Sequence, residues 1–264
     1  MSYGSYGGRF PQSNFSRPQS NVPPGVKWLL IVNVAVFVAY FLAVRFGYAG
    51  LFEPFKLRLK WVVEGFAIWQ PVTYLFLHDP LGFGHIFFNM LALFMFGRDL
   101  ELRWGTQAFL RYYFVCGIGA ALCSLAMSAV TGHYGATIGA SGAIYGLLLA
   151  FGMLFPDQTI WFNFLFPMKA KYFVMIIGAV SFLMTLGATG DNVSHIAHLG
   201  GMLWGYLYLK GYLFKDSMQR SRPAVAPSSS GGILQWYKEW KLARARRKFE
   251  VYMRKQTGRD TTIH

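Results

Sequence analysis

Four polar residues stand in otherwise apolar stretches of the chain, and their types are those that acyl transfer needs. Ser141 offers a hydroxyl nucleophile and His198 a base, while His85 and Asn89 offer hydrogen-bond donors. His85 and Asn89 are four residues apart, so in a helix they share one face. Polar groups are costly in an apolar medium and commonly mark function there. The set predicts a serine activated by a histidine, with two donors facing an oxyanion.

Glycines accompany both halves of this predicted pair. A Ser–His hydrogen bond requires a separation of about 2.6–3.2 Å, so the helices that carry the two residues must approach closely. Small residues four apart allow such an approach in membranes. One pair follows the serine and another follows the histidine: Gly142, Gly146, Gly201 and Gly205. We therefore expect these four glycines to pack helix against helix.

Each polar residue also has a structural explanation. A serine in a membrane helix often bonds to its own backbone, and His85 with Asn89 could form an interhelical hydrogen-bond pair. His195, three residues before His198, is assigned a structural role, with that of a local proton partner as the alternative. No HExxH motif is present, and neither cysteine lies in a recognisable metal cluster. We expect no metal and no cofactor, and the repeats typical of transporters are not evident.

The composition indicates a membrane protein. Of 264 residues, 54% are hydrophobic and 14% are charged, against about 25% charged in an average soluble domain. A spanning helix needs about 20 mainly apolar residues. Apolar stretches near this length occupy 28–44, 80–97, two parts of 112–156, 172–189 and 193–209. The sequence predicts an all-α, polytopic membrane protein with six transmembrane helices.

The net charge of +14 lies mainly in the two tails. Residues 1–27 contain three basic and no acidic residues, and residues 210–264 contain 13 basic and 4 acidic residues. Basic residues near span ends favour the inner side of a membrane, so we expect both termini in the cytoplasm. A nucleic-acid-binding protein would spread this charge over a folded face. No nucleic-acid partner is expected.

Three motifs together resemble the rhomboid family of intramembrane serine proteases. They are GHIFFN at 84–89, GASGAIYG at 139–146 and AHLGGMLWG at 197–205. The resemblance covers residues 26–213, a rhomboid-like membrane protease domain. It leaves residues 1–25 as a disordered tail and residues 214–264 as a basic, partly helical tail.

The resemblance implies cleavage of a transmembrane protein substrate in or next to its membrane helix. Ser141 would be the nucleophile and His198 the general base of a dyad, with His85 and Asn89 stabilising the oxyanion. Tyr145, one turn after Ser141, matches the aromatic residue that stacks on the catalytic histidine. A rhomboid-like protein without proteolytic activity, which binds or escorts membrane clients, remains the alternative.

Two further expectations concern the surroundings of this domain. Arg9 and Arg17 without acidic neighbours raise the alternative of organelle targeting, but Gly and Pro in the first 25 residues oppose an amphipathic targeting helix, and the chain is expected in a plasma membrane of the bacterial type. The basic helix expected at 233–255 would bind anionic lipid at the inner surface; the alternative is a freely solvated cytosolic tail. Residues 45–84 carry basic and aromatic side chains together, so we expect them to lie in the membrane interface.

Overall fold

The computed structural model describes residues 22–132, 135–162, 166–186 and 192–220, together with Lys241 and Arg244. The chain divides into two units, Met1–Tyr212 and Leu213–His264, and the first contains nearly all described residues. Its elements are α1 (Pro24–Arg45), η1 (Ala49–Phe55), α2 (Leu59–Val63), α3 (Gln70–Thr73), η2 (Tyr74–Phe76), α4 (Phe83–Trp104), α5 (Thr106–Thr131), α6 (Ser141–Leu154), β1 (Thr159–Phe162), β2 (Phe166–Lys169), α7 (Ala170–Leu186) and α8 (Asn192–Arg220). The tail predictions for 1–21 and 233–255 fall outside the described residues, apart from Lys241 and Arg244.

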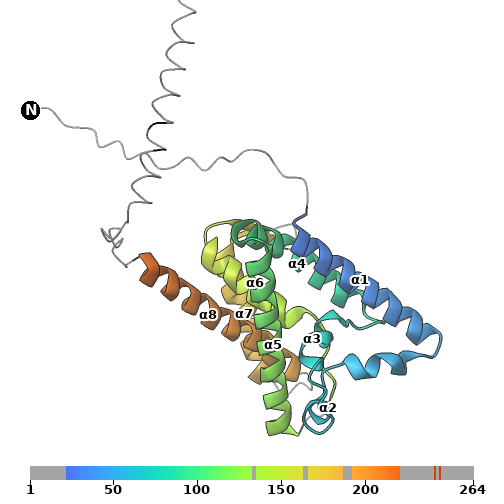
Figure 1. Cartoon of the computed structure of the whole chain (residues 1–264). Helices are drawn as coiled ribbons and strands as arrows, with labels where there is room; N and C mark the ends of the chain where they lie inside the picture. The colour runs from blue at the N-terminus through green and yellow to red at the C-terminus, as the bar shows by residue number, and fades with distance from the viewer. Residues whose placement is uncertain are drawn as a thin grey trace, which may run out of the picture. The chain divides into compact units, whose positions relative to one another are not determined.

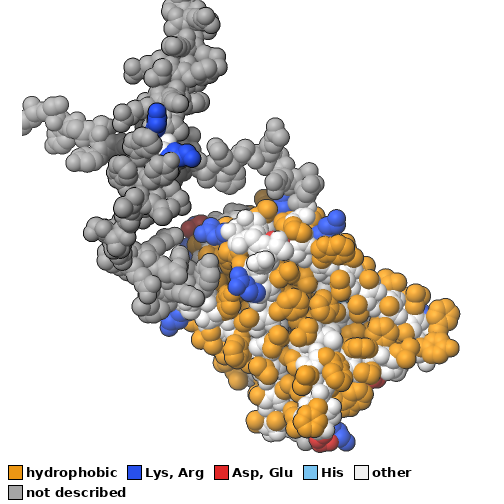
Figure 2. All heavy atoms as spheres, in the orientation of Figure 1, with side chains coloured by type: hydrophobic (Ala, Val, Ile, Leu, Met, Phe, Trp, Pro, Cys, Tyr) orange, Lys and Arg blue, Asp and Glu red, His pale blue; other side chains and the backbone are white. Residues whose placement is uncertain are grey.

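The long helices of the first unit coincide with the expected apolar stretches. By length and composition α1 and α5 could each cross a membrane, and α6 and α7 are shorter apolar helices. In Figure 2 hydrophobic side chains cover most of the visible face of this unit, and charged side chains lie at its ends. Large side chains such as Val34 on α1 and Leu183 on α7 are exposed. So extensive an apolar surface is typical of contact with lipid rather than water.

The core lies where α5 and α6 pack together, with α4 and α7 also against α6 and α1 against α4 (Figure 1). Aromatic side chains fill it, and Phe109, Tyr112 and Tyr113 are fully buried. Two buried hydroxyls donate to helix carbonyls: Tyr112 to Gly146 at 2.8 Å and Tyr74 to Gly117 at 2.7 Å. Burial of these hydroxyls is therefore compensated by hydrogen bonds.

A buried carboxylate joins α4 to the beginning of α1. Glu101 accepts hydrogen bonds from the backbone N–H groups of Gly25 at 2.8 Å and Val26 at 2.7 Å, and from the Thr106 hydroxyl at 2.7 Å. The first N–H groups of a helix have no partner within it, and a negative charge is favourable there. Gly25 suits this contact, because a Cβ at that position would lie 3.0 Å from the carboxylate oxygens. Glu101 thus caps α1.

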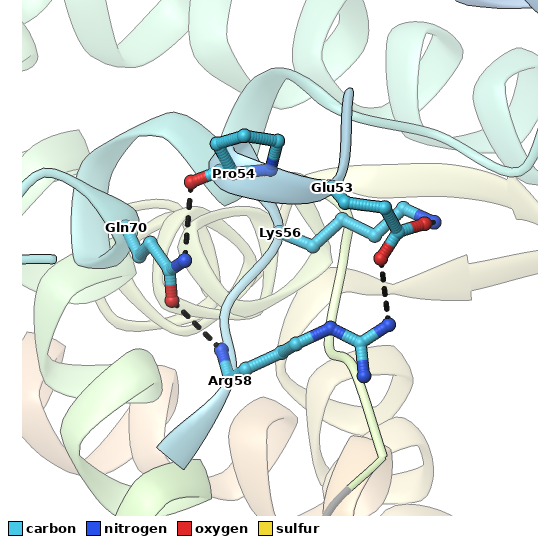
Figure 3. A network of polar contacts seen from close by, with 5 residues as sticks. All are labelled: Glu53, Pro54, Lys56, Arg58 and Gln70. Carbon is cyan, nitrogen blue, oxygen red and sulfur yellow. Dashed lines mark hydrogen bonds and ion pairs between the residues drawn. The ribbon is translucent and has the colours of Figure 1, made fainter. Parts of the chain in front are cut away.

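The segment between α1 and α4 folds into short helices held by a polar network (Figure 3). Gln70 is fully buried; its amide nitrogen donates to the Pro54 carbonyl at 3.1 Å, and its oxygen accepts from the Arg58 backbone N–H at 3.0 Å. Glu53 forms ion pairs with Lys56 and Arg58. Two basic residues of this segment, Lys56 and Arg58, are therefore paired with a carboxylate.

A hairpin of two strands separates α6 from α7 and was not expected from the sequence. Strands β1 and β2 are antiparallel, with Thr159 opposite Lys169 and Ile160 opposite Met168. Asp157 forms ion pairs with Lys169 and Lys171 across the base of the hairpin, at 3.2 and 3.1 Å. This small sheet is the one departure from an all-helical fold among the described residues.

Candidate active site

Ser141 is the first residue of α6, so its position depends on the loop that precedes the helix. That loop is fixed by an isolated bridge between Leu57 and Thr137 and by a hydrogen bond from the Gly139 N–H to the Tyr74 carbonyl at 2.9 Å. Gly139 has φ +122°, a conformation that residues with a side chain rarely adopt. A Cβ there would also lie 2.9 Å from His85 Nε2. Glycine therefore allows the loop to pass between His85 and Ser141.

The glycines after Ser141 and His198 lie where α5, α6 and α8 meet. A Cβ at Gly201 would overlap the carbonyl oxygen of Gly142, so α6 and α8 touch through their backbones. A Cβ at Gly146 would overlap Cys116 on α5, and one at Gly205 would overlap the Tyr112 hydroxyl. The expected close approach of the two helices is present, and α5 takes part in it.

This close approach places the serine and the histidine within hydrogen-bond distance. His198 Nε2 lies 2.8 Å from Ser141 Oγ. The Tyr145 ring is stacked on the His198 imidazole, with centroids 4.1 Å apart and planes 5° apart. Ser181 on α7 donates to the Tyr145 hydroxyl at 3.2 Å. The imidazole is thus restrained on one face by Tyr145, which is itself held by α7.

His85 and Asn89 lie on α4, on the other side of Ser141. His85 Nε2 and Ser141 Oγ both border Gly139, at 2.9 and 3.9 Å from the point where a Cβ on that residue would lie. The Asn89 amide nitrogen donates to the His85 carbonyl at 2.7 Å. An asparagine amide carries two hydrogens, so one remains for another acceptor. Both side chains point toward the space that Ser141 faces, since all three line the same cavity.

That cavity has a volume of about 570 Å³ and is mainly apolar. Its polar end is formed by His85, Asn89, Ser141, Tyr145 and His198. Elsewhere its walls come from α4, α6, β1 and α7, and include Phe88, Met95, Trp161 and Phe173. The sequence motifs identified the polar end. The contribution of Trp161 depends on the unpredicted hairpin.

His78 lies next to this site, between η2 and α4. Its side chain is fully buried, and its ring centroid is 5.1 Å from that of His85. Burial, with a smaller contribution from the neighbouring His85, lowers the pKa of His78 to about 3. His78 is therefore neutral at physiological pH and adds no positive charge beside His85.

Three residues next to the site were not among the site residues predicted from the sequence: Gly139, Ser181 and His195. Ser181 and Gly139 contact site residues as described, and the ring of His195 is 6.0 Å from that of His198. Ser181 was detectable as a hydroxyl in an apolar helix. Among the described residues, no group of three or more His, Cys, Asp or Glu side chains could hold a metal ion.

Fold and site together define a helical membrane protein in which a serine–histidine pair closes one end of an apolar cavity. The chain belongs to the rhomboid family, since the profile of the Rhomboid domain matches residues 65–214. Rhomboid protein 1, mitochondrial, of Saccharomyces cerevisiae is 33% identical over 150 residues, covering 53% of this chain and 40% of that protein. RHOMBOID-like protein 11, chloroplastic, of Arabidopsis thaliana is 28% identical over 210 residues, covering 74% and 69%.

A bacterial relative carries the name of a protease. Rhomboid protease GluP of Bacillus subtilis is 31% identical over 138 residues, which are 52% of this chain and 25% of that protein. The chain therefore spans less than half the length of the yeast and Bacillus relatives. The family thus includes proteins named as proteases.

The expectation of a plasma membrane with cytoplasmic termini is wrong. Several of the similar proteins are named mitochondrial or chloroplastic, which favours an organellar membrane. The error has two physical reasons. Gly and Pro in the first 25 residues argue only against an amphipathic targeting helix there, and basic residues near span ends orient a chain without distinguishing one kind of membrane from another.

Proposed function

We propose that this chain is an intramembrane serine endopeptidase with a Ser141–His198 dyad. The main support for this proposal is the distance of 2.8 Å between His198 Nε2 and Ser141 Oγ at the cavity wall. His198 takes the Ser141 proton as Oγ attacks the scissile carbonyl, and then gives it to the leaving amine. Water repeats the sequence on the acyl-enzyme, which releases the second product and restores the serine.

The oxyanion of each tetrahedral intermediate is stabilised from two sides. The Ser141 backbone N–H lies at the N-terminus of α6, where helix N–H groups are free and the dipole favours negative charge. The remaining Asn89 amide hydrogen and the His85 imidazole approach from α4. Each donor in such a site contributes about 10²–10³ in rate.

The membrane arrangement follows from the lengths of the helices. We propose that α1, α4, α5, α6, α7 and α8 form the six transmembrane segments of a domain covering residues 26–213, with the loop before Ser141 completing the crossing that α6 begins. Because α6 has 14 residues, it is about 21 Å long, whereas the hydrocarbon core is about 30 Å thick. Ser141, at its end, then lies below the membrane surface and hydrolyses bonds at that depth.

The cavity offers a long apolar wall beside the serine. It follows α4 from Gly84 to Phe96, about 18 Å at 1.5 Å per residue. A peptide carbonyl inside a helix accepts a hydrogen bond within that helix, so Ser141 can attack it only where the helix is opened. The proposed substrate is a transmembrane protein whose helix unwinds where it is cut.

A reconstitution experiment tests this function. The full chain and a model transmembrane substrate are placed in liposomes, and cleavage is compared among wild type, Ser141→Ala and His198→Ala. Ser128→Ala is the matched control, because Ser128 is a buried serine on α5 that does not line the cavity. We expect cleavage by wild type and the control alone. Equal cleavage by the Ser141 and His198 variants would exclude the dyad.

The same preparation distinguishes the alternative of a client-binding protein without proteolytic activity. A fluorophosphonate probe reacts with a serine that a neighbouring base activates. Labelling of wild type and not of Ser141→Ala supports the protease. Substrate that copurifies with wild type but is never cleaved, without labelling of the serine, supports client binding.

The basic C-terminal segment provides a second membrane contact in this proposal. Residues 210–264 contain 13 basic and 4 acidic residues, and each basic residue near an anionic surface contributes about 1 kcal/mol. Cosedimentation of a peptide covering 233–255 with liposomes tests the contact. Binding that does not increase with the anionic lipid content would refute it.

A further inference from the structure

The general base has a second ring nitrogen that the dyad does not use. His198 Nδ1 is buried and has no hydrogen-bond partner among the described residues. For Nε2 to accept the serine proton, a neutral imidazole must carry its own proton on Nδ1. A buried N–H group without an acceptor is costly. His198 therefore needs an acceptor at Nδ1.

His195 lies one turn earlier on the same helix and offers a ring nitrogen that can accept a hydrogen bond. Its Nδ1 is also buried and has no partner among the described residues. The two rings are 6.0 Å apart at an interplanar angle of 77°. Residues three apart on a helix are surface neighbours. Two adjacent imidazoles thus each have a buried, unpartnered nitrogen, of which one must donate and the other can accept.

Stacking on Tyr145 does not resolve which nitrogen of His198 faces the serine. The stacked ring fixes the plane of the imidazole to within 5°, but a half-turn about the Cβ–Cγ bond keeps the ring in that plane. The half-turn would remove Nε2 from Ser141. A hydrogen bond at Nδ1 distinguishes the two orientations.

We propose that His195 is the positioning residue of the dyad. His198 donates its Nδ1–H to one buried water, and this water donates a hydrogen bond to Nδ1 of His195. This inference rests on the proposed protease function. One water with two hydrogen bonds of about 2.8 Å joins nitrogens up to about 5.6 Å apart, and unsatisfied buried polar groups are where ordered waters bind. In serine proteases with a triad a carboxylate takes this position. Among the described carboxylates, none forms a hydrogen bond or ion pair with His198.

The consequence for catalysis concerns the orientation and charge of the base. With Nδ1–H held, the Nε2 lone pair points at Ser141 Oγ. When the serine proton moves to Nε2, the positive charge spreads over the ring, and the water and His195 stabilise it at Nδ1. His195 contacts no substrate, so its loss lowers kcat and leaves KM unchanged.

Two substitutions in the full-length protein separate positioning from packing. His195→Phe keeps an aromatic ring but removes both nitrogens, and His195→Gln keeps a polar side chain that can accept. We expect kcat to fall about 10- to 100-fold in His195→Phe, as for a misplaced catalytic group, with KM within twofold. His195→Gln should recover most of the rate. Asp191→Asn is the matched comparison, because Asp191 is the nearest acidic residue before this helix in the sequence.

A spectroscopic measurement makes the result independent of turnover. In ¹⁵N-histidine-labelled protein, the His198 Nδ1–H resonance should be present in wild type and should shift or exchange faster in His195→Phe. Wild-type kcat and an unchanged resonance in His195→Phe would overturn the proposal. Equal losses of kcat in the Phe and Gln variants, or a loss in Asp191→Asn instead, would also overturn it. If wild type neither cleaves substrate nor reacts with the serine probe, the protease function fails while the resonance still tests the His195–His198 contact.

Discussion

The contact between α6 and α8 makes Gly201→Ala the most informative single substitution. A Cβ at Gly201 would overlap the Gly142 carbonyl oxygen. Non-bonded heavy atoms need about 3.5 Å, so the two helices must separate by roughly 1 Å or more. The Ser141–His198 distance of 2.8 Å would then increase to about 3.8 Å, beyond the hydrogen-bond range of about 3.2 Å.

The expected loss is both catalytic and structural. A displacement of about 1 Å at reacting groups lowers the rate about 10²-fold, and overpacking costs about 1–3 kcal/mol of stability. Cleavage in liposomes and thermal unfolding in detergent measure the two effects. Gly211→Ala on the same helix is the control, since a Cβ there meets nothing within 4 Å. Wild-type kcat and wild-type melting temperature in Gly201→Ala would refute the close packing of α6 and α8.

Three further perturbations test the surroundings of the site. Tyr145→Ala should lower kcat about 2- to 10-fold, because aromatic stacking contributes about 0.5–1.5 kcal/mol, whereas Tyr145→Phe should stay near wild type. Glu101→Ala leaves buried N–H groups of α1 without an acceptor and should reduce stability by about 1–3 kcal/mol, seen as a lower melting temperature. Glu53 has its pKa lowered from 4.5, mainly by the hydrogen bond from Lys56 and also by Arg58. Its stabilisation is therefore present above pH 4.5 and is lost as the pH falls through the lowered pKa, seen as faster hydrogen exchange in residues 49–73.

Each of these three measurements has a matched control. Tyr206 is an exposed tyrosine on α8, and Tyr206→Ala should keep wild-type kcat. Glu64 is exposed, so Glu64→Ala should keep the melting temperature; an equal decrease in both glutamate variants would contradict the cap. Glu53→Gln should remove the acid-dependent part of the exchange, and an unchanged pH response would exclude Glu53 as its source.

The sequence was most informative about features that depend on one helix alone, such as its location and the motif it carries. Apolar runs located the long helices of the described residues, because burial in lipid or core depends on local composition. They misplaced several ends, since α4 extends to Trp104, α5 begins at Thr106 and α8 extends to Arg220. The motifs identified Ser141 and His198, and the structure brings their side chains together. The 2.8 Å distance between His198 Nε2 and Ser141 Oγ depends on three helices packing through glycines. The periodicity of one sequence does not predict how closely separate helices approach.

Other features depended on contacts between distant residues and were not predictable. The four-residue strands β1 and β2 exist because they pair with each other, and neither is long enough to show an alternating pattern. The role of Gln70 depends in the same way on distant residues, because its buried amide bonds to two backbone groups of the connection between α1 and α4. The membrane was misassigned because neither the charge pattern nor the Gly and Pro content of the first 25 residues distinguishes a plasma membrane from an organellar one.

The cap on α1 bears on how the protein is made. Glu101 follows Gly25 by 76 residues, so at about 5–20 residues per second the ribosome supplies the carboxylate roughly 4–15 s after the helix that it caps. During that interval α1 must persist with its first N–H groups bonded to water or lipid headgroups. Its docking then awaits synthesis of the turn between α4 and α5. Slower elongation at this turn would prolong the exposure of the first helix to quality-control proteases.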